Sequence, residues 1–367
     1  MTYFNNNHNR LATFIFFNNH IPSKETYLPF TPTKTQNFSK IKTFAKIQIM
    51  KHLLSILDLS SDDILRLMDS ALRLKAPGAL KKSRKICEGK SIGIISEKPS
   101  TRTTISFAVA ANQLGACPII IPAGELQRKR GETIEDTART LSRFLDAISY
   151  RAFKDEDVRK FAEYSRVPVI NALTDKEHPC QALGDFLTII EKKIPQIPRA
   201  GKKILPFLSK LKIAFIGDGN NVFNSWIYLA SKMGLNFVHA SPQNFSAAQE
   251  VKNTASKLAA QSGASISFTD DPFEAARNAD VIYTDVWTSM GDEDEEAERK
   301  KTFAPYQINS NIIAHAKPDV IVMHCLPARR GEEITDEVMD GPHSAVFDQA
   351  ENRLHIQKAI LIKILHK

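Results

Sequence analysis

Four consecutive residues, Ser100-Thr101-Arg102-Thr103, are the first place in the sequence where side chains suited to binding an anion occur together. They follow a short apolar run, Ser91–Ser96, and precede apolar residues at helical spacing, so we expect them at a strand-to-helix turn. Free N–H groups at a helix N-terminus attract phosphate, and three hydroxyls and a guanidinium add further donors. Helices often begin with Ser or Thr, so this segment alone is consistent with a phosphate site or with a plain N-cap.

A second group of polar side chains stands at two further strand ends. His178 and Gln181 occupy the turn after the strand-like Val167–Asn171, where they could aim donors at one carbonyl oxygen. Arg151 directly follows the strand-like Ala147–Tyr150, at the edge where open α/β sheets bind ligands. Taken singly, His178 is more typical of a packed or capping histidine, and Arg151 of a surface arginine.

The second half of the chain contains three further turns after apolar runs. The turn Gly217–Asn221 (GDGNN) begins like a dinucleotide-binding motif, but Val222 replaces its third glycine and no acid follows the next strand, which disfavours NAD. Asp285 could hold an ammonium group, and the Gly-containing segment after it could form a mobile lid. Cys325 could be a small buried hydrophobe or, if its pKa is lowered, a reactive thiolate.

The segments that must position these side chains alternate between strand-like and helical patterns. Ser60 and Asp63 predict a capping box at the start of a helix that ends near Lys75. The alternation predicts βαβ units with parallel sheets, and it restarts after a Lys- and Pro-rich connection at Glu191–Lys203. A final helix is predicted within Glu351–His366. The predicted buried or strand-like runs are Ser91–Ser96, Pro118–Ile121, Ala147–Tyr150, Val167–Asn171, Leu211–Gly217, Asn236–His239, Ala279–Tyr283 and Asp319–Met323.

Composition is typical of a globular protein of about two domains. The 367 residues are 43% hydrophobic and 25% charged, which excludes collagen, a coiled coil or disorder as a description of the whole chain. No apolar run approaches the roughly 18 residues of a membrane span. The four cysteines are isolated, so neither a zinc site nor a disulfide framework is predicted and a reducing compartment is favoured: Cys87, Cys117, Cys180 and Cys325.

The net charge of +8 is unevenly distributed along the chain. Six basic residues and one acid precede Met50, so this Asn- and Thr-rich leader carries +5 and the remainder only +3. We expect the leader to be a disordered extension, or translation to start at Met50; a transit peptide is the alternative, against which its single Arg argues. A nucleic-acid-binding function is disfavoured because no basic stripe with interleaved aromatic residues follows Met50.

The motifs STRT, HPCQ, GDGNN, DVWTSMG and HCLPA, in this order and at these intervals, resemble the ornithine branch of the aspartate/ornithine carbamoyltransferase family. The resemblance covers Met50 to Lys367 and continues through EDTAR at Glu135–Arg139 and FDQAENRLH at Phe347–His355. STRT and HPxQ are typical of carbamoyltransferases generally, whereas SMG and HCLP are typical of the ornithine branch. Departures from the family pattern stand beside the motifs and concern packing more than chemistry: Ser96, Thr104 and Ala108.

The resemblance implies transfer of the carbamoyl group of carbamoyl phosphate to the δ-amine of L-ornithine, giving L-citrulline and phosphate, in arginine biosynthesis or a urea-cycle step. It implies an α/β protein with two doubly wound parallel-sheet domains, residues 50–190 for carbamoyl phosphate and 191–345 for ornithine, and a C-terminal helix, 346–367, packed on the first domain. It implies no cofactor, no metal, no nucleic-acid or membrane partner, a homotrimer and a cytoplasmic location. The mitochondrial matrix is the alternative if residues 1–49 are a transit peptide, and putrescine is an alternative acceptor.

The site residues implied by the resemblance form two groups. Carbamoyl phosphate would be bound by Ser100, Thr101, Arg102, Thr103, Arg151, His178, Gln181, Cys325, Leu326 and Arg353, and by Gln127 reaching from a neighbouring subunit. Ornithine would be bound by Asn221, Asp285, Ser289 and Met290, with Asp285 near its amines. Arg102, Arg151 and His178 would stabilise the oxyanion that forms on attack. Cys325 would position or deprotonate ornithine without forming a covalent intermediate.

Overall fold

The computed structural model describes residues 51–195, 201–288 and 295–366, which lie within one compact unit. The predictions for the leader before Met50, for Ser289, for Met290 and for the middle of the Lys- and Pro-rich connection concern residues outside these ranges. Within them, no helix has the length and apolar character needed to cross a membrane.

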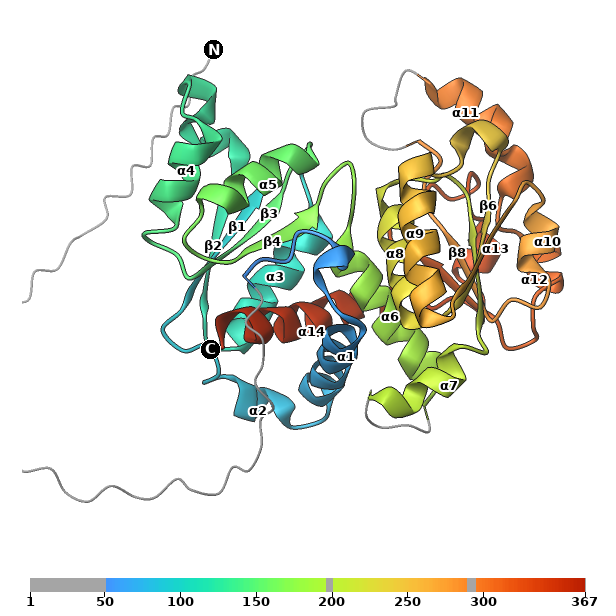
Figure 1. Cartoon of the computed structure of the whole chain (residues 1–367), viewed down its shortest axis with the longest axis horizontal. Helices are drawn as coiled ribbons and strands as arrows, with labels where there is room; N and C mark the ends of the chain where they lie inside the picture. Colours follow the sequence, from blue (N-terminus) through green and yellow to red (C-terminus); the bar gives the residue numbers. More distant parts are fainter. Residues whose placement is uncertain (1–50, 196–200, 289–294, 367) are drawn as a thin grey trace, which may run out of the picture. The chain divides into compact units, whose positions relative to one another are not determined.

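Four parallel strands form the sheet of the first lobe, in the order β2-β1-β3-β4 (Figure 1). They are β1 (Ser91–Ser96), β2 (Cys117–Pro122), β3 (Ala147–Arg151) and β4 (Val169–Leu173), so the four predicted runs are confirmed as strands. The helices of this lobe are α1 (Ser61–Lys75), α2 (Ala79–Ser83), α3 (Thr101–Gln113), α4 (Ile134–Leu141), α5 (Asp155–Tyr164) and α6 (Pro179–Lys193).

The prediction that Pro118–Ile121 is buried is wrong. The run belongs to β2, which is an edge strand, and Ile119 and Ile120 expose 40% and 53% of their surface. An apolar run indicates a strand that is buried against another surface. Whether elements of the same chain supply that surface depends on the position of the strand in the sheet.

Five parallel strands form the sheet of the second lobe, in the order β7-β6-β5-β8-β9. The sequence does not single out β7, an edge strand whose short SISFT alternation is largely exposed. The strands are β5 (Lys212–Ile216), β6 (Asn236–Ala240), β7 (Ser265–Thr269), β8 (Val281–Thr284) and β9 (Ile321–His324). The helices are α7 (Leu205–Leu208), α8 (Asn221–Met233), α9 (Gln249–Ser262), α10 (Pro272–Ala276), α11 (Glu296–Phe303), α12 (Ser310–Ala314) and α13 (Asp336–Met339).

The last helix, α14 (Val346–Leu365), packs against α1, α3 and α6 of the first lobe, as Figure 1 shows. The predicted capping box is also confirmed, because Ser60 and Asp63 exchange hydrogen bonds at the start of α1. Two doubly wound parallel sheets with a returning C-terminal helix are therefore the observed fold, as predicted.

Each sheet reverses its strand order at one point, and several of the candidate residues lie at these two points, while HPCQ follows the edge strand β4 and HCLPA begins at the last residue of the edge strand β9. In the first sheet the chain adds β2 on one side of β1 and then β3 on the other. In the second sheet β6 and β7 lie on one side of β5, and β8 and β9 on the other. Ligands of open α/β sheets bind beyond the carboxyl ends of the strands at such switch points. STRT follows β1 and Arg151 is the last residue of β3, and GDGNN and Asp285 follow β5 and β8.

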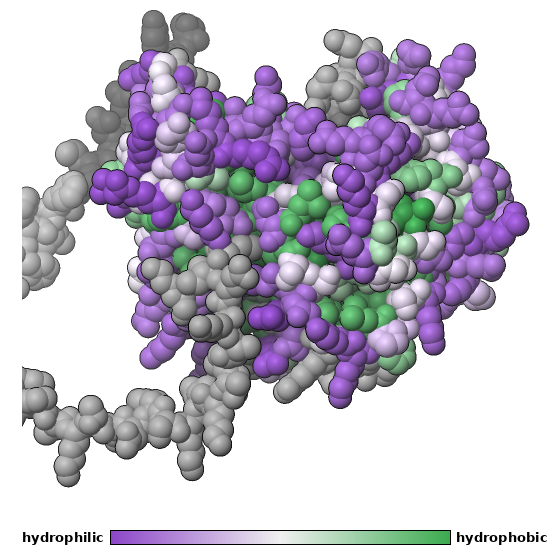
Figure 2. Space-filling view, in the orientation of Figure 1, coloured by the Kyte–Doolittle hydropathy of each residue, from purple (hydrophilic) through white to green (hydrophobic). Residues whose placement is uncertain are grey.

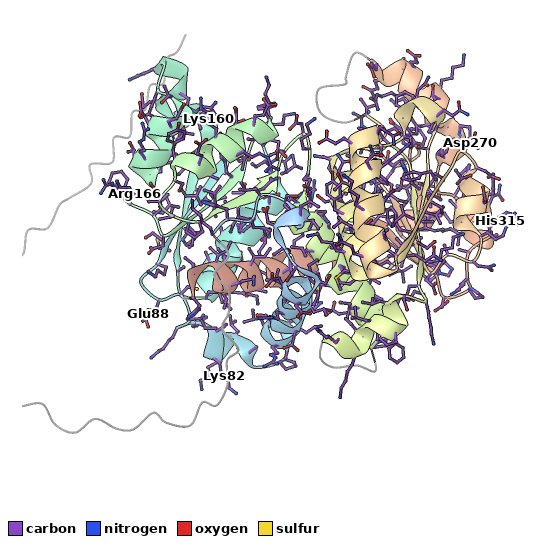
Figure 3. The ribbon with its side chains drawn as sticks, viewed as in Figure 1. Lys82, Glu88, Lys160, Arg166, Asp270 and His315 are labelled. Carbon is purple, nitrogen blue, oxygen red and sulfur yellow. The ribbon has the colours of Figure 1, made fainter. Side chains whose placement is uncertain are left out.

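Hydrophilic side chains cover most of the face shown in Figure 2, with hydrophobic patches between them. Charged and polar side chains also project outward along the margins of both lobes in Figure 3; they are Lys82, Glu88, Lys160, Arg166, Asp270 and His315. The candidate site residues differ from these surface groups because most of them are buried or partly buried.

Candidate active site

The STRT segment lies at the start of α3 and contacts two arginines from distant parts of the chain. Ser100 is the N-cap residue, but its hydroxyl caps no N–H of the helix and instead accepts a hydrogen bond from Nη1 of Arg151 at 3.0 Å. Thr103 is buried and accepts from Nη2 of Arg353 at 3.1 Å. Thr101 is exposed and Arg102 partly buried. The plain N-cap interpretation of this segment is therefore not supported.

Gln181, in the first turn of α6, connects the buried arginine of α14 to the interior of the first lobe. Its Oε1 accepts from Nη1 of Arg353, and its Nε2 donates to Oδ1 of Asp185 at 2.7 Å. Arg353 exposes 2% of its surface and Gln181 1%. Both side chains are thus held in place from several sides, which limits the geometry that a bound ligand would meet.

Three arginines form a cationic cluster around His178. Burial, followed by the charges of Arg353 and Arg102, lowers the pKa of Arg151 to about 10. Burial and then Arg353, Arg151 and Arg102 lower the pKa of His178 well below its usual range, so its imidazole is neutral. In the described ranges no carboxylate forms an ion pair with Arg151 or Arg353, and Nδ1 of His178 and Nε of both arginines lack hydrogen-bond partners. Uncompensated buried cations and unpaired donors favour an anionic ligand.

Asp285, directly after β8, is the centre of the second group. Its Oδ2 accepts from Nδ2 of Asn220 at 2.8 Å, and its Oδ1 accepts from Sγ of Cys325 and from its neighbour Val286 N, each at 2.8 Å. Asn220 caps α8 with its side-chain oxygen, so one residue fixes both the helix start and the carboxylate. Asn221 lies beside it and donates from Nδ2 to the carbonyl of Thr174 at 2.5 Å.

Cys325 joins the two groups electrostatically. Burial, the charge of Asp285 and the hydrogen bond to that carboxylate raise the pKa of the Cys325 thiol well above its usual value. The thiol is therefore protonated and donates to Asp285. The charge of Arg102 acts on this pKa in the opposite sense, and Arg151 and Arg353 are also within electrostatic range of Cys325. The same side chain is hydrogen-bonded to Asp285.

The grouping of Asp285, His324 and Cys325 brings ligand atoms of metal-binding types within 4.8 Å of one another. Both ring nitrogens of His324 are already engaged: Nδ1 accepts from the backbone N of Leu326 at 2.9 Å, and Nε2 contacts Oε1 of Glu333 at 3.0 Å. The imidazole thus shapes the turn at Leu326, whose φ of 58° lies in the left-handed region. This arrangement leaves His324 without a free lone pair for an ion.

The structure brings together most of the residues singled out in the sequence, but not all. Gln127, in a short 3-10 helix (Gln127–Arg130), is exposed and makes no contact with the arginine cluster in the described part of the chain. Three buried or partly buried residues that hold the site were not singled out: Asp185, Asn220 and Glu333. Asn220 stood within the GDGNN motif, whereas a lone acid within a helix or loop gives no signal by its type or spacing.

Two family models match consecutive parts of the chain. Residues 51–191 match the carbamoyl-P binding domain of aspartate/ornithine carbamoyltransferases, and residues 209–364 match the Asp/Orn binding domain of the same family. The models therefore account for both lobes and for α14.

Named relatives resemble the chain over nearly their whole length. An ornithine carbamoyltransferase of Bacillus subtilis is 50% identical over 317 residues, 86% of this chain and 94% of the relative. One of Methanosarcina acetivorans is 49% identical over 315 residues, 86% of this chain and 99% of the relative. A relative of Pyrococcus furiosus named as the anabolic enzyme is 45% identical, again over 86% of this chain.

Solved structures resemble the fold as closely. The ornithine carbamoyltransferase of Pyrococcus furiosus superposes with a TM-score of 0.80 at 45% identity, covering 86% of this chain and 97% of that structure. The ornithine transcarbamoylase of Giardia lamblia gives a TM-score of 0.77 at 32% identity, covering 87% and 99%.

Proposed function

The chain belongs to the aspartate/ornithine carbamoyltransferase family, and we propose that it transfers the carbamoyl group of carbamoyl phosphate to the δ-amine of L-ornithine, giving L-citrulline and phosphate. The observation that carries this proposal is the position of Cys325, which is hydrogen-bonded to Asp285 and lies within electrostatic range of Arg102, Arg151 and Arg353. The Cys325 thiol thus adjoins both the arginines, which can hold an anion, and Asp285, which can hold an ammonium group. The direction is citrulline synthesis for arginine biosynthesis, in keeping with the anabolic relative.

Carbamoyl phosphate occupies the first switch point in this proposal. Ser100, Thr101, Arg102 and Thr103 hold the phosphate at the start of α3, with Arg353 behind them. Arg151, His178 and Gln181 hold the carbamoyl oxygen and amide, and Cys325 and the backbone of Leu326 complete the site. The unpartnered Nδ1 of the neutral His178 supports its role, because a neutral imidazole can donate or accept without adding charge.

Ornithine occupies the second switch point. Asp285 takes its amine groups, and Asn221, Ser289 and Met290 complete the acceptor site. The protonated Cys325 thiol is bonded to Asp285, which supports a role in positioning the amine rather than in removing its proton. A carboxylate between the two substrates also keeps a cationic ornithine amine close before it loses its proton.

The reaction requires no group beyond these side chains. The δ-amine attacks the carbamoyl carbon as the free base, a new C–N bond forms, and the negative charge gathers on the carbamoyl oxygen near Arg102, Arg151 and His178. The C–O bond to phosphate then breaks, the electron pair leaves with phosphate, and the proton released by the attacking nitrogen passes to that phosphate. Holding both substrates in contact supplies much of the acceleration.

The assembly and location belong to the same proposal. A homotrimer in which Gln127 reaches the site of a neighbouring subunit is supported by the exposure of Gln127 and by the exposed apolar side chains of β2. A cytoplasmic location is supported by four free cysteines, because unpaired thiols are typical of reducing compartments.

The deciding experiment is a carbamoyl-transfer assay with three acceptors offered separately: L-ornithine, L-aspartate and putrescine. We expect citrulline from ornithine with a kcat/KM at least about 100-fold above that for the other two, since only ornithine presents both a δ-amine and an α-amino-acid group. Carbamoylaspartate or carbamoylputrescine as the preferred product contradicts the assignment, as does the absence of any carbamoyl product.

A further inference from the structure

Asp185 is a completely buried carboxylate in the middle of α6 that accepts hydrogen bonds from four different side chains. Its Oδ1 accepts from Nε2 of Gln181 at 2.7 Å and from Nε2 of Gln349 at 2.8 Å. Its Oδ2 accepts from Nε1 of Trp226 at 3.0 Å and from the hydroxyl of Tyr283 at 2.9 Å. The donors come from α6, α14, α8 and β8, so one carboxylate touches elements of both lobes.

The two donors at Oδ1 lead directly to the candidate site. Gln181 presents its Oε1 to Arg353, and Gln349 presents its Oε1 to the backbone N of His324 at 2.9 Å, next to Cys325. The indole donor at Oδ2 leads to no residue of the site in the described ranges. The other donor at Oδ2, the hydroxyl of Tyr283, itself accepts from Nε2 of Gln349 at 3.1 Å, so only the indole leads away from the site.

The orientation of the two amides follows from the chemistry of their acceptor. A glutamine amide has an oxygen that accepts and a nitrogen that donates, and either can point in a given direction. An ionised carboxylate only accepts, so it attracts the Nε2 of both Gln181 and Gln349 and leaves each Oε1 pointing away. Those oxygens are what Arg353 and the His324 N–H require.

We propose that Asp185 is a positioning residue that orients the amides of Gln181 and Gln349, and through them sets Arg353 in the carbamoyl-phosphate site and the turn containing Cys325, which adjoins Asp285 of the ornithine site. This inference rests on the proposed function for the identity of the substrates. One buried carboxylate then coordinates the two halves of the site, which belong to different lobes and to residues far apart in the sequence.

Burying the Asp185 carboxylate costs free energy, because the charged group loses its hydration. Burial raises the pKa of Asp185 to about 6, while its four hydrogen bonds act in the opposite sense. No cation forms an ion pair with it among the described residues. An apolar residue at this position would leave four buried donors without an acceptor, so the carboxylate is retained by the groups that it orients. An asparagine would turn its NH₂ group either toward the two glutamine amides or toward the indole and the tyrosine hydroxyl, so at least one of the four donors loses its acceptor.

The test compares Asp185→Asn with two variants that each remove one donor, Gln349→Met and Trp226→Phe. We expect Asp185→Asn to lower kcat at least about tenfold and to raise KM for both substrates. Gln349→Met raises the KM for ornithine more than the KM for carbamoyl phosphate. It removes the amide that holds the turn at His324 and Cys325, and the Cys325 thiol is hydrogen-bonded to Asp285. Trp226→Phe is the matched control: it lowers the melting temperature but keeps kcat and both KM values within about twofold of the starting protein.

Two outcomes overturn the inference. One is Asp185→Asn with unchanged kinetic constants. The other is that Gln349→Met and Trp226→Phe change kcat and KM equally for the same loss of melting temperature. This comparison decides the matter even if Asp185→Asn does not fold. If the unaltered protein makes no citrulline, the proposed function fails by itself. Calorimetric titration with inorganic phosphate then still tests the positioning role, with weaker binding expected in Asp185→Asn and unchanged binding in Trp226→Phe.

Discussion

Single residues of the candidate site are of two kinds, those held by neighbours and those with unpaired donors. Arg353 is held between Thr103 and Gln181. In the described ranges, Nδ1 of His178 and the Nε atoms of Arg151 and Arg353 have no hydrogen-bond partner. An unpaired buried donor loses hydrogen-bond energy that a ligand can restore, so these atoms mark the side from which the anion is bound.

We expect Arg102→Gly to lower kcat/KM for carbamoyl phosphate by at least about 100-fold, because it removes a cation placed at the developing oxyanion. Arg66→Gly in α1 is the matched control, since it makes the same substitution at an exposed arginine of another helix of this lobe. Both variants lose up to about 1 kcal/mol of helix stability. Citrulline assays and thermal melts separate the effects, and a near-normal rate in Arg102→Gly contradicts the assignment of the anion site.

The helices and strands position the candidate site residues through the turns at their ends. The STRT, Arg151, GDGNN and Asp285 positions all lie at the carboxyl ends of strands that flank a switch point. The turn between β5 and α8 is closely packed, because Gly219 lies against Ala247: a Cβ at position 219 would be 2.6 Å from the backbone N of Ala247. Asn220, next in the chain, caps α8 and holds Asp285. The close packing of Gly219 therefore fixes Asn220, and through Asn220 the position of Asp285 in the ornithine site.

Gly219→Ala is expected to destabilise the fold by about 1–3 kcal/mol, since the new methyl group meets backbone that cannot rotate away. The displaced turn also moves Asn220, so the KM for ornithine rises more than the KM for carbamoyl phosphate. Gly201→Ala, where a Cβ meets nothing within 4 Å, serves as control. Denaturant melts and initial rates provide the two readings, and equal changes in both KM values argue against a local effect on the turn.

At the scale of the whole molecule, polar contacts join the two lobes. Glu177 is buried next to His178 and accepts hydrogen bonds from Ser55, from Ile56 N at 3.1 Å and from the hydroxyl of Ser225 on α8 at 3.1 Å. The same hydroxyl accepts from the backbone N of His178 at 2.8 Å. The lobes are thus joined at a point that adjoins the anion site.

Stability is expected to depend on pH through this residue. Burial raises the pKa of Glu177 from 4.5 to about 7. The folded state therefore binds a proton more tightly than the unfolded state, and stability falls as pH rises from about 4.5 to about 7, by on the order of 1–3 kcal/mol. Glu177→Gln flattens this slope, whereas Glu163→Gln at an exposed site leaves it intact. Urea melts at several pH values decide, and an unchanged slope in Glu177→Gln refutes the prediction.

The trimer of the proposal predicts complementation between inactive variants. Gln127→Ala and Arg102→Gly should each be inactive alone, but a hybrid trimer contains sites that pair an intact Arg102 with an intact Gln127 from the next subunit. In a closed ring of three, every mixed trimer has one such pair, so about one third of the sites of the purified hybrids are intact. Co-expression with two affinity tags, followed by a citrulline assay of the doubly purified hybrids, measures this. Isolated hybrids with no recovered activity would falsify the shared site.

Much of the fold could be predicted from the sequence because its signals are local. The apolar runs of β1 and β3, the capping box at Ser60 and the helical spacing of the last segment each depend on residues within one or two turns. The STRT and HPCQ motifs are likewise contiguous, so their chemistry could be inferred before their positions were known. The exposure of Ile119 and Ile120 could not be inferred, because it depends on which strands lie on either side of β2.

The sequence by itself determined which side chains are available for chemistry and at which strand ends they stand. Only the tertiary structure decided which of them meet: Arg353 with Gln181, Cys325 with Asp285, and Asp185 with donors from four elements. The physical reason is that strand and helix signals extend over a few residues, whereas hydrogen bonds in the site join residues up to 250 positions apart in the chain, as for Thr103 and Arg353. Pairing at that range is set by the packing of the two sheets and α14.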